Sequence, residues 1–394
     1  MVAFSRGVRS DHIRLTARWR RRPASRIYSH RMQDLIVIGA GLSGLAVARG
    51  AAAAGLSVRV LEARGRIGGR VLSHRTPAGA YDLGPAWIWP TMQPRVAALA
   101  WSAGLALREQ AEQGGFLFQD AAGRTRRLAH GFPQEPPSMR VVGGIAAMVE
   151  AAAAAVPEGT VLTGHAATRI ALTDAGVAVT TQKAGSETTF EAGRAVLALP
   201  PRLAAGLGFA PALPPPARAA LTAVPGWMAG QAKALAVYER PFWREAGLSG
   251  SAFSDAGPLG EMHDATLPGE AEGALFGFFT WPPALREARR EALPGLVARQ
   301  LAALFGPEAA NPRELVIHDW SREAFTATEA DQDIPEAHPQ YRPLALPPPW
   351  HGRVLLAGAE MAPEFGGYLE GALAAAEAVL AALAVTRPGL PSAR

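Results

Sequence analysis

The sequence predicts an α/β fold in which a Rossmann-like, dinucleotide-binding domain made of discontinuous segments is joined to an α+β substrate domain. One observation is a strand, glycine turn, helix and second strand between residues 34 and 62, the pattern of a nucleotide-binding unit. A second is another short apolar run near residue 355, followed by a pair of glycines. A third is the length of 394 residues, which suits two or three lobes rather than one core.

The first strand and the turn after it carry the clearest signal. Leu35–Ile38 is entirely apolar, as is typical of a strand buried on both faces of a parallel sheet. Gly39, Gly41 and Gly44 follow at G-x-G-x-x-G spacing. The first permits a tight turn, the second lets backbone approach a pyrophosphate, and the third lets the helix pack on the strand. Ser43–Ala54 is predicted as that helix, with its amino end toward the phosphates.

A carboxylate closes this unit. Val58–Leu61 predicts the second strand, and Glu62 follows it, 23 residues after Gly39, where an acid accepts hydrogen bonds from an adenosine ribose. The same charge would repel a 2′-phosphate, so NADP is disfavoured. A lone glycine motif also arises in an ordinary α/β turn. Here strand, helix, strand and acid are all in register, which indicates dinucleotide binding.

A second basic and glycine-rich stretch, Arg64–Arg70, follows the acid directly. In a plain NAD domain this stretch has no set function, whereas in flavoproteins that hold FAD extended across the sheet a second glycine turn there touches the diphosphate. Together, Gly39–Gly44, Glu62 and Arg66–Arg70 resemble the flavin-containing amine oxidase (monoamine oxidase-like) family. The alternative for Arg70 is a solvated surface arginine.

Three further segments extend the resemblance to nearly all of the chain after the first 31 residues. Tyr81–Trp87 resembles the family's segment that passes the flavin, Ala167 matches a strand residue whose backbone meets the adenine, and Val354–Gly371 resembles the second flavin fingerprint. Within the last segment, the resemblance places Glu360 beside the ribityl–pyrophosphate chain; the alternative is an ordinary helix-end acid. A helix beginning near Leu369 is expected to direct its positive end at flavin N1 and O2.

The resemblance implies that FAD is the cofactor. The residues it implies for cofactor binding are Gly39, Gly41, Leu42, Ser43, Gly44, Glu62, Ala63, Arg64, Gly69, Arg70, Gly84, Pro85, Ala86, Trp87, Ala167, Glu360, Gly367, Tyr368 and Leu369. The chain has no cysteine, which excludes attachment of a flavin through sulfur. Ala324 stands where the resemblance places the cysteine that monoamine oxidases join to FAD. The cofactor is therefore expected to be bound non-covalently.

Lys233 is the first candidate catalytic residue. It is one of two lysines in the chain and lies in an apolar stretch that reads as a strand, where burial of the charge is costly and lowers the pKa of the side chain. Lys233–Trp243 resembles the family segment whose lysine holds a water near flavin N5. The alternative is a lysine that extends from a strand edge into solvent.

Tyr368 and Phe325 are the other candidate catalytic residues. In the resemblance they match the two aromatic rings that flank the amine, orient its α-carbon toward N5 and keep the site dry. The alternative for each ring is core packing. Trp87 stands where amino-acid oxidases of the family carry an arginine that holds the substrate carboxylate, so amino acids are disfavoured as substrates. Trp87 and Trp89 line an apolar pocket or pack in the core.

The remaining acidic and histidine-containing motif, Glu261–Asp264, is interpreted as a solvated loop. It has no partner at metal-ligand spacing, and no metal site is expected. No serine–histidine–acid set stands out.

The charge and the apolar content of the chain limit the kinds of partner that it is expected to bind. Residues 1–33 carry nine arginines and one acid, a charge of +8, so with a total of +5 the rest of the chain is at −3, and no nucleic-acid surface is expected. No apolar run reaches the roughly 20 residues of a membrane span. Arginine greatly outnumbers lysine, which suggests a bacterial source, and a cytoplasmic location is expected. The sequence does not specify the oligomeric state.

The basic leader is set apart from the fold. Arg20–Arg22 has the look of a twin-arginine signal, but no apolar region or cleavage site follows. The segment is a non-native start ahead of Met32, a disordered arm or a targeting peptide.

The expected domain organisation follows the alternation of strands, helices and proline-rich crossings. Thr188–Glu191 and Ala195–Leu199 are predicted as two strands, and Pro283 to about Phe305 as one helix. The predicted units are a leader (1–31), an FAD-binding domain (32–88, 138–202 and 346–386), a substrate domain (89–137 and 203–345) and a tail (387–394).

The resulting hypothesis is an FAD-dependent oxidoreductase that resembles amine oxidases. It would transfer a hydride from the carbon beside nitrogen to flavin N5, giving an imine that water hydrolyses, and dioxygen would reoxidise the flavin. The substrate is expected to be a small apolar or aromatic amine. An alternative on the same scaffold is a desaturase or dehydrogenase of the polyprenoid or porphyrinogen type, which a long apolar channel would favour. Non-redox use of FAD and flavin binding without catalysis also stay open.

Overall fold

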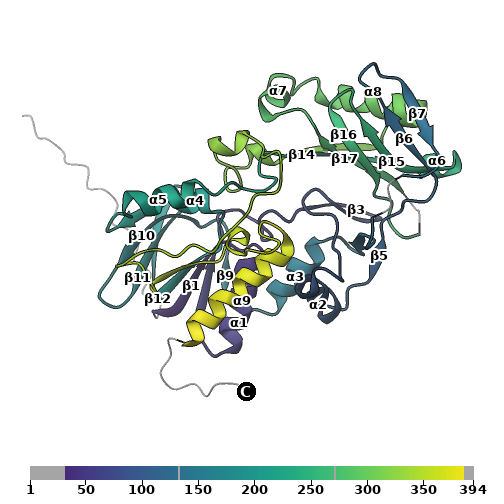
Figure 1. The fold of residues 1–394 in the computed structure, drawn as a ribbon. Helices are drawn as coiled ribbons and strands as arrows, with labels where there is room; N and C mark the ends of the chain where they lie inside the picture. Colours follow the sequence, from purple (N-terminus) through teal and green to yellow (C-terminus); the bar gives the residue numbers. More distant parts are fainter. Residues whose placement is uncertain (1–31, 132–133, 270–271, 386–394) are drawn as a thin grey trace, which may run out of the picture.

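The computed structural model describes residues 32–131, 134–269 and 272–385. The expectations for residues 1–31 and 387–394 lie outside the described residues. The described chain forms two lobes, each built on one large sheet, with helices gathered against the sheets (Figure 1). The predicted α/β class is confirmed. Within the described ranges, no helix is both long enough and apolar enough to cross a membrane.

The first sheet has the order β13-β10-β11-β12-β1-β2-β9, with β19 paired to β12 off this path. Its central strand, β1, pairs in parallel with β2 on one side and with β12 on the other. Successive side chains of β1 point to opposite faces, as the pleat requires, so Leu35 and Val37 join one core and Ile36 and Ile38 another. The strands are β1 (Gln33–Ile38), β2 (Val58–Leu61), β9 (Val161–Leu162), β10 (Ala166–Leu172), β11 (Val177–Lys183), β12 (Ser186–Leu197), β13 (Gly208–Ala210) and β19 (Val354–Leu356).

Strand β12 corrects one expectation, because Thr188–Glu191 and Ala195–Leu197 belong to one continuous strand rather than two. Its first half pairs antiparallel with β11, and its second half pairs in parallel with β1 and β19. The composition changes along the strand because its second half is buried between two parallel neighbours, whereas its first half has several exposed or half-buried positions in the outer hairpin. The change in composition therefore resembles a boundary between two strands.

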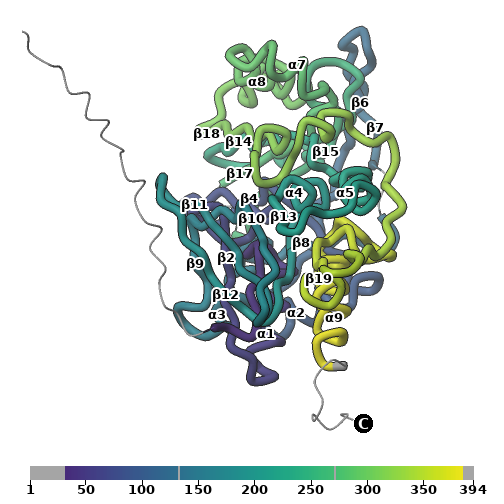
Figure 2. The backbone as a smooth tube through the Cα atoms, turned by 90° about the vertical axis from the view of Figure 1, so that its left-hand side faces the viewer, coloured from purple at the N-terminus to yellow at the C-terminus, as the bar shows by residue number. Residues whose placement is uncertain are grey.

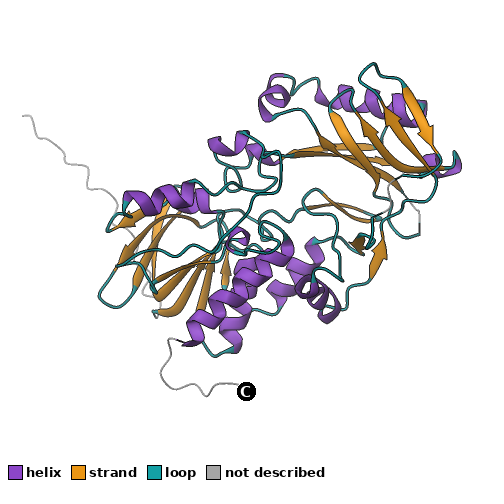
Figure 3. Cartoon of the chain, in the orientation of Figure 1, coloured by secondary structure: helices purple, strands orange, loops and turns teal. Residues whose placement is uncertain are grey.

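Helices cover both faces of the first sheet (Figure 3). On one face α1, α3 and α9 pack together, with α2 against α9; on the other lie α4 and α5. A Cβ added to Gly50 would lie 2.4 Å from a methyl carbon of Leu380, so α1 and α9 are in close contact. The helices are α1 (Leu42–Ala53), α2 (Pro94–Ser102), α3 (Ala146–Ala154), α4 (Pro201–Ala205), α5 (Pro215–Thr222) and α9 (Leu369–Val385).

The second sheet has the order β18-β14-β17-β16-β15-β6-β7 and forms the core of the other lobe, uppermost in Figure 2. Strand β14, which lies between β18 and β17, is buried along its whole length. Helix α8 packs on one face, and the other face turns toward the first lobe. The strands are β6 (Gly115–Gln119), β7 (Thr125–Leu128), β14 (Ala232–Tyr238), β15 (Leu248–Ser254), β16 (Leu259–Asp264), β17 (Gly273–Phe279) and β18 (Glu314–Asp319).

Two expectations in this lobe are wrong. The helix predicted from Pro283 to about Phe305 is two helices, α7 (Pro283–Ala288) and α8 (Leu293–Phe305), because Pro294 lacks the N–H that a continuous helix needs and begins a new one. Glu261–Asp264 is not a solvated loop: it is part of strand β16, between β15 and β17. Polar side chains lie on both faces of this strand, Glu261 and His263 on one and Asp264 on the other, so the apolar–polar alternation that predicts a strand is lost.

Shorter elements connect the lobes. Three segments within the range expected for the substrate domain contact the first lobe: α2 joins the core around α1, β13 pairs with β10, and α5 packs on the first sheet through Leu221. The shorter elements are β3 (Ser73–Thr76), β4 (Gly79–Asp82), β5 (Leu107–Glu109), β8 (Met139–Val141), α6 (Phe242–Glu245), and the 3-10 turns η1 (Pro307–Ala310), η2 (Trp320–Arg322), η3 (Glu329–Gln332) and η4 (Ala359–Met361).

Candidate active site

A cavity of about 900 Å³ lies between the two lobes and is lined by residues of both. This volume is at the upper end of the range for small-molecule sites, about 300–1,000 Å³. Of the residues predicted to bind cofactor or substrate, all but two line it. Those that do are Gly39, Gly41, Leu42, Ser43, Glu62, Ala63, Arg64, Gly69, Arg70, Gly84, Pro85, Ala86, Trp87, Ala167, Gly367, Tyr368 and Leu369, together with Lys233 and Phe325. The exceptions are Gly44 and Glu360.

The three glycines of the first turn have different surroundings. Gly39 has a φ of +106°, and a Cβ there would lie 2.6 Å from the carbonyl oxygen of Ala198. A Cβ on Gly44 would lie 1.9 Å from the Gly39 oxygen, so the third glycine serves helix–strand packing, as predicted. A Cβ on Gly41 would meet only the Gly68 oxygen, at 3.9 Å. The space in front of Gly41 is therefore open to the cavity, where a phosphate could approach the backbone.

Glu62 is buried at the end of β2, with both carboxylate oxygens close to backbone N–H groups. The N–H of Ala40 donates to Oε2 at 2.8 Å and the N–H of Arg64 donates to Oε1 at 2.9 Å. These bonds hold the glycine turn and the start of the basic stretch around one carboxylate. Further acceptor lone pairs of the same carboxylate are available to the cavity that it lines.

Arg70 and Glu360 form an ion pair beneath the cavity. Both guanidinium nitrogens Nη1 and Nη2 donate to the Glu360 carboxylate, the second at 3.2 Å. Burial lowers the pKa of Arg70, but the adjacent carboxylate outweighs it and raises that pKa above its ordinary value. Glu360 is fully buried and reaches the cavity only through the arginine. The pair leaves no local pattern to predict it, because its members are 290 residues apart.

Lys233 lies on β14 with its ammonium group buried between the lobes. Nζ donates to the backbone oxygen of Gly84 at 2.6 Å and to that of Asp82 at 3.4 Å. It also lies 4.8 Å from the ring centroids of Phe276 and Phe278. Burial lowers the pKa of Lys233 to about 7, opposed by the nearby Asp82 carboxylate. The side chain therefore titrates near neutral pH, in the range in which a proton-transfer group works best.

A row of side chains crosses the second sheet at Lys233. Phe278 lies directly opposite Lys233 on β17, and Glu261 lies opposite Phe278 on β16. Residues paired across antiparallel strands point to the same face, so the three side chains face the same way, and all three line the cavity. Sequence reasoning found Lys233 and missed the other two, since neighbours across a sheet leave no local pattern.

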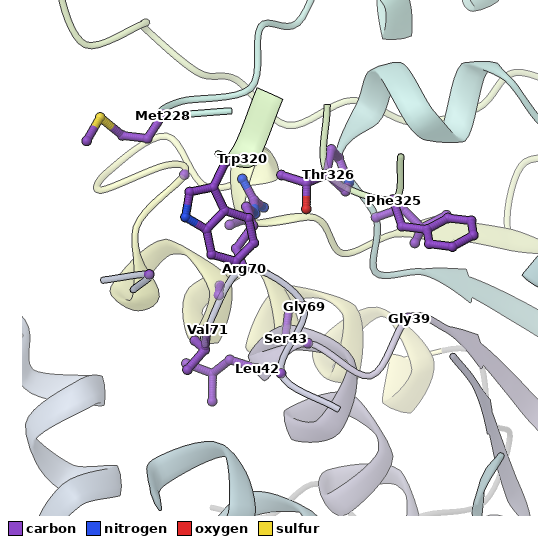
Figure 4. Close-up of a pocket in the computed structure, with 18 of the residues that line it drawn as sticks. Gly39, Leu42, Ser43, Gly69, Arg70, Val71, Met228, Trp320, Phe325 and Thr326 are labelled. Carbon is purple, nitrogen blue, oxygen red and sulfur yellow. The ribbon is translucent and has the colours of Figure 1, made fainter. Parts of the chain in front are cut away.

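Phe325 and Tyr368 both line the cavity, but their rings are not brought together. Phe325 is 44% exposed, and its ring lies 5.6 Å from the guanidinium carbon of Arg64. Figure 4 shows it at one side of the pocket, pointing away from Trp320. Tyr368 instead stacks on His338, with ring centroids 5.0 Å apart and planes at 22°. Among the described residues no direct ring contact joins Phe325 to Tyr368. That the two rings flank a bound amine stays a prediction.

Arg64 links the two lobes beside Phe325. Its guanidinium donates to Glu323 at 2.9 Å and to the hydroxyl of Thr326 at 2.8 Å. Trp320, at the start of the same loop, donates from its indole nitrogen to the backbone oxygen of Leu83 at 3.0 Å. The loop that follows β18 is therefore fixed against the nucleotide lobe at two points.

Trp87 forms part of the cavity wall and is held by a buried glutamine. Its indole nitrogen donates to Gln110 Oε1 at 2.8 Å, while Gln110 Nε2 donates to the backbone oxygen of Asp264 at 2.7 Å. The indole packs edge-on against His263 at 4.9 Å and is tilted against Phe276 at 5.4 Å. Trp87 therefore belongs both to the cavity lining and to an aromatic cluster on the second sheet.

A glycine turn, a carboxylate after the second strand and an open cavity at the ends of parallel strands define a two-lobed dinucleotide-binding protein. Comparison with known families makes this specific. Residues 130–382, more than half of the chain, match the family described as flavin containing amine oxidoreductase, and residues 37–101 match a NAD(P)-binding Rossmann-like domain. The chain belongs to the flavin-containing amine oxidoreductase family and is a flavin-dependent oxidoreductase. The resemblance drawn from the sequence is confirmed.

Relatives of similar length have several activities in their names. A putative flavin-containing monoamine oxidase of Mycobacterium tuberculosis is 28% identical over 453 residues, covering 89% of this chain and 96% of that protein. An L-amino acid dehydrogenase of Synechocystis is 25% identical and covers 89% and 94%. A putrescine oxidase of Kocuria rosea is 25% identical and covers 75% and 84%.

Solved structures share the fold. Putrescine oxidase bound to putrescine aligns with a TM-score of 0.74 at 21% identity, covering 90% of this chain and 99% of that one. Cyclohexylamine oxidase of Brevibacterium oxydans aligns with a TM-score of 0.72 at 22% identity, covering 91% and 100%. At these identities the likeness concerns the fold alone.

Proposed function

We propose that this protein is an amine oxidase that binds FAD non-covalently and removes a hydride from the carbon beside an amine nitrogen. Bound FAD would supply the hydride acceptor, and dioxygen would be the final oxidant, with water hydrolysing the imine product. The observation that carries the proposal is one continuous cavity that joins the Rossmann glycine turn to Lys233 and a wall of aromatic side chains.

The residues at the first lobe fit an extended dinucleotide. The open space before Gly41 suits a diphosphate, the Glu62 carboxylate suits a ribose hydroxyl, and the start of α9 at Leu369 suits a site where negative charge builds. The Arg70 guanidinium adds a fixed positive charge beside the second glycine turn. Ala324 also lines the cavity and offers no atom for attachment, which supports reversible binding.

Lys233 is proposed as the residue that holds a water or a proton near the reacting carbon. Two of its donors are directed at the carbonyls of Gly84 and Asp82, which leaves one position of the nitrogen for the cavity. Its pKa near 7 lets the nitrogen exchange a proton at physiological pH.

The walls support an amine with an apolar or aromatic body. Trp87, Phe278, Trp227 and Tyr368 supply apolar area against which such a body would pack. Among the residues that the structure describes, no arginine lines the wall at Trp87, so the carboxylate of an amino acid lacks a cationic partner there. We also propose a cytoplasmic location. The division into two domains near residues 89 and 203 stays a proposal, with α2, β13 and α5 counted in the first lobe because they contact it.

Anaerobic mixing tests this function directly. Protein purified with FAD is mixed without oxygen with aliphatic, cyclic and aromatic amines, and with amino acids, while flavin absorbance is recorded. We expect amines to bleach the flavin band and air to restore it with release of peroxide. Lys233→Met should slow the bleaching about 10- to 100-fold. Lys183→Met, at the exposed second lysine on β11, is the matched control and should not slow it. Bleaching by no amine would overturn the proposal.

A further inference from the structure

Arg140 is a buried arginine without a carboxylate partner. It lies on β8 and is 3% exposed, and its Nη1 donates to Oε1 of Gln110 at 3.3 Å. Among the described residues this is the only hydrogen bond of its side chain, and it forms no ion pair. Arginine is almost never fully buried unless it is paired, so this guanidinium keeps most of its positive charge uncompensated inside the protein.

The guanidinium of Arg140 and the amine of Lys233 lie over the same aromatic ring. Cζ of Arg140 is 5.3 Å from the ring centroid of Phe276, and Nζ of Lys233 is 4.8 Å from that centroid. The two groups are therefore at most about 10 Å apart, and all three residues are buried. Two like charges at this separation inside a protein repel each other by more than the thermal energy.

One buried carboxylate, that of Asp82, accompanies these two basic groups. It accepts hydrogen bonds from the Ser73 hydroxyl at 2.6 Å and from the N–H of Ile145 at 2.9 Å, while the backbone oxygen of Asp82 accepts from Lys233 at 3.4 Å. One anion balances one cation, and a second cation leaves a net charge that is costly to bury. A guanidinium does not release its proton in proteins, whereas an amine can, so Lys233 is the group that becomes neutral.

The other groups that face Lys233 do not change this balance. His318 lies opposite Lys233 on β18, and burial lowers the pKa of its imidazole below the ordinary value, so it is uncharged at neutral pH. Phe278, opposite Lys233 on β17, carries no charge. Glu261, one strand further on β16, attracts a proton to Lys233, but it is 43% exposed and solvent weakens that attraction. In the described part of the chain, Arg140 is the cation that opposes a proton on Lys233.

We propose that Arg140 is a positioning residue for the reaction, and that its unpaired guanidinium repels a proton on Lys233 and keeps that amine neutral. This inference rests on the proposed amine oxidation and names the residue that prepares Lys233 for it. Two positions of Nζ are directed at the carbonyls of Asp82 and Gly84. In the ammonium form the third position is another N–H, which repels a protonated amine. In the neutral form it is a lone pair, which accepts a hydrogen bond from water or from the substrate's ammonium group.

Nuclear magnetic resonance of the lysines tests this inference without turnover. The chain has two lysines, so protein made with lysine isotope-labelled at Cε gives two signals, and Lys183→Met identifies the one from Lys233. The shift of this carbon follows protonation of Nζ, and its midpoint is measured against pH in the FAD-loaded wild type, Arg140→Gln and Arg108→Gln. Arg108 is the matched control, because it pairs with Arg140 across β5 and β8 but is not among the groups that act on Lys233.

We expect a midpoint near pH 7 in the wild type and a midpoint about one pH unit higher in Arg140→Gln. Arg108→Gln should stay within about 0.3 unit of the wild type. The rate of anaerobic flavin reduction by an amine should show the same displacement of its acid limb. In Arg140→Gln it should fall about fivefold at pH 7 and recover near pH 9, whereas a merely structural defect would lower the rate at every pH.

Gln110→Glu is a second variant, which keeps the arginine in place. It sets a carboxylate against the Arg140 guanidinium, compensates its charge and should also raise the Lys233 midpoint. The comparison therefore holds even where Arg140→Gln does not fold.

An unchanged Lys233 midpoint in Arg140→Gln, or in Gln110→Glu where the first variant does not fold, would overturn the inference. An equal displacement in Arg108→Gln would overturn it too, because the effect would then come from the general field of the basic residues. If no amine reduces the flavin while the midpoint moves as expected, the proposed function fails and the control of Lys233 by Arg140 is confirmed. If amines reduce the flavin and the midpoint does not move, only this inference fails.

Discussion

At the first lobe the cavity is lined by residues of two glycine turns and one acid that are close in sequence, whereas on the sheet of the second lobe Lys233, Phe278 and Glu261 come from three different strands. In the first region backbone atoms supply most of the groups that face the cavity, and the charged side chains are neutralised by partners in the protein. In the second region side chains face the cavity, and one carboxylate oxygen of Glu261 is available to a ligand. The first wall therefore depends on backbone geometry, and the second wall depends on individual side chains that single substitutions can change.

The largest effect is expected at the glycine turn of the first region. Gly44→Ala puts a methyl group where the Gly39 oxygen lies, at 1.9 Å, so we expect loss of folded protein or a destabilisation of about 3 kcal/mol or more. Gly41→Ala meets only open space, so it should fold normally and lose flavin. Thermal melts and the flavin-to-protein absorbance ratio check both. Equal stability of the two variants would contradict the packing argument.

Lys233 tests the second region through pH. Its pKa is lowered from 10.5 to about 7 on folding, so between these values the unfolded chain binds more protons than the folded one. The free energy of unfolding, relative to that of Lys233→Met, should therefore rise with pH across this window by about 5 kcal/mol, and the difference should be flat outside it. Denaturant unfolding at several pH values, with Lys183→Met as the control, measures this difference. Parallel curves for wild type and Lys233→Met would refute it.

Breaking the ion pair of the first region should cost somewhat less. Glu360→Gln leaves the Arg70 guanidinium without its carboxylate, which we expect to destabilise the protein by about 3 kcal/mol and to weaken flavin retention. The exposed pair Arg75–Glu150 provides the matched comparison, and Glu150→Gln should cost less than about 1 kcal/mol. Urea unfolding of both variants gives the two values, and similar costs would mean that burial of the first pair is unimportant.

The smallest effect is expected at Phe325, on the border between the regions. Because its ring packs on Arg64 and is partly exposed, Phe325→Ala should change kcat/KM for amines by less than about twofold. Tyr368→Ala, which removes a ring stacked on His338, should lower it by about tenfold. Steady-state kinetics of both variants with the same amine measure the two changes in kcat/KM. A large loss of kcat/KM in Phe325→Ala would instead support the facing-ring arrangement that the family resemblance implies.

The predictability of the site from the sequence follows the same division. Gly39, Gly41, Glu62 and the acid-to-glycine spacing are local, so their positions in the fold could be read directly, and the family resemblance followed from them. Glu261 was misread as part of a loop, because its place in the site depends on strand pairing with residues 17 positions away in sequence, at Phe278. Interactions such as Arg70 with Glu360 cross the whole chain and leave no periodicity to detect.

The buried amide of Gln110 has a consequence for how this enzyme can diversify. One side chain holds both the Trp87 indole and the backbone of β16, the strand that carries Glu261. A change that enlarges or reshapes the tryptophan wall must either keep that amide satisfied or release the strand end as well. Evolution of a new specificity should therefore change the tryptophan wall and the β16 wall of the pocket together. Compensating substitutions should accumulate at Gln110.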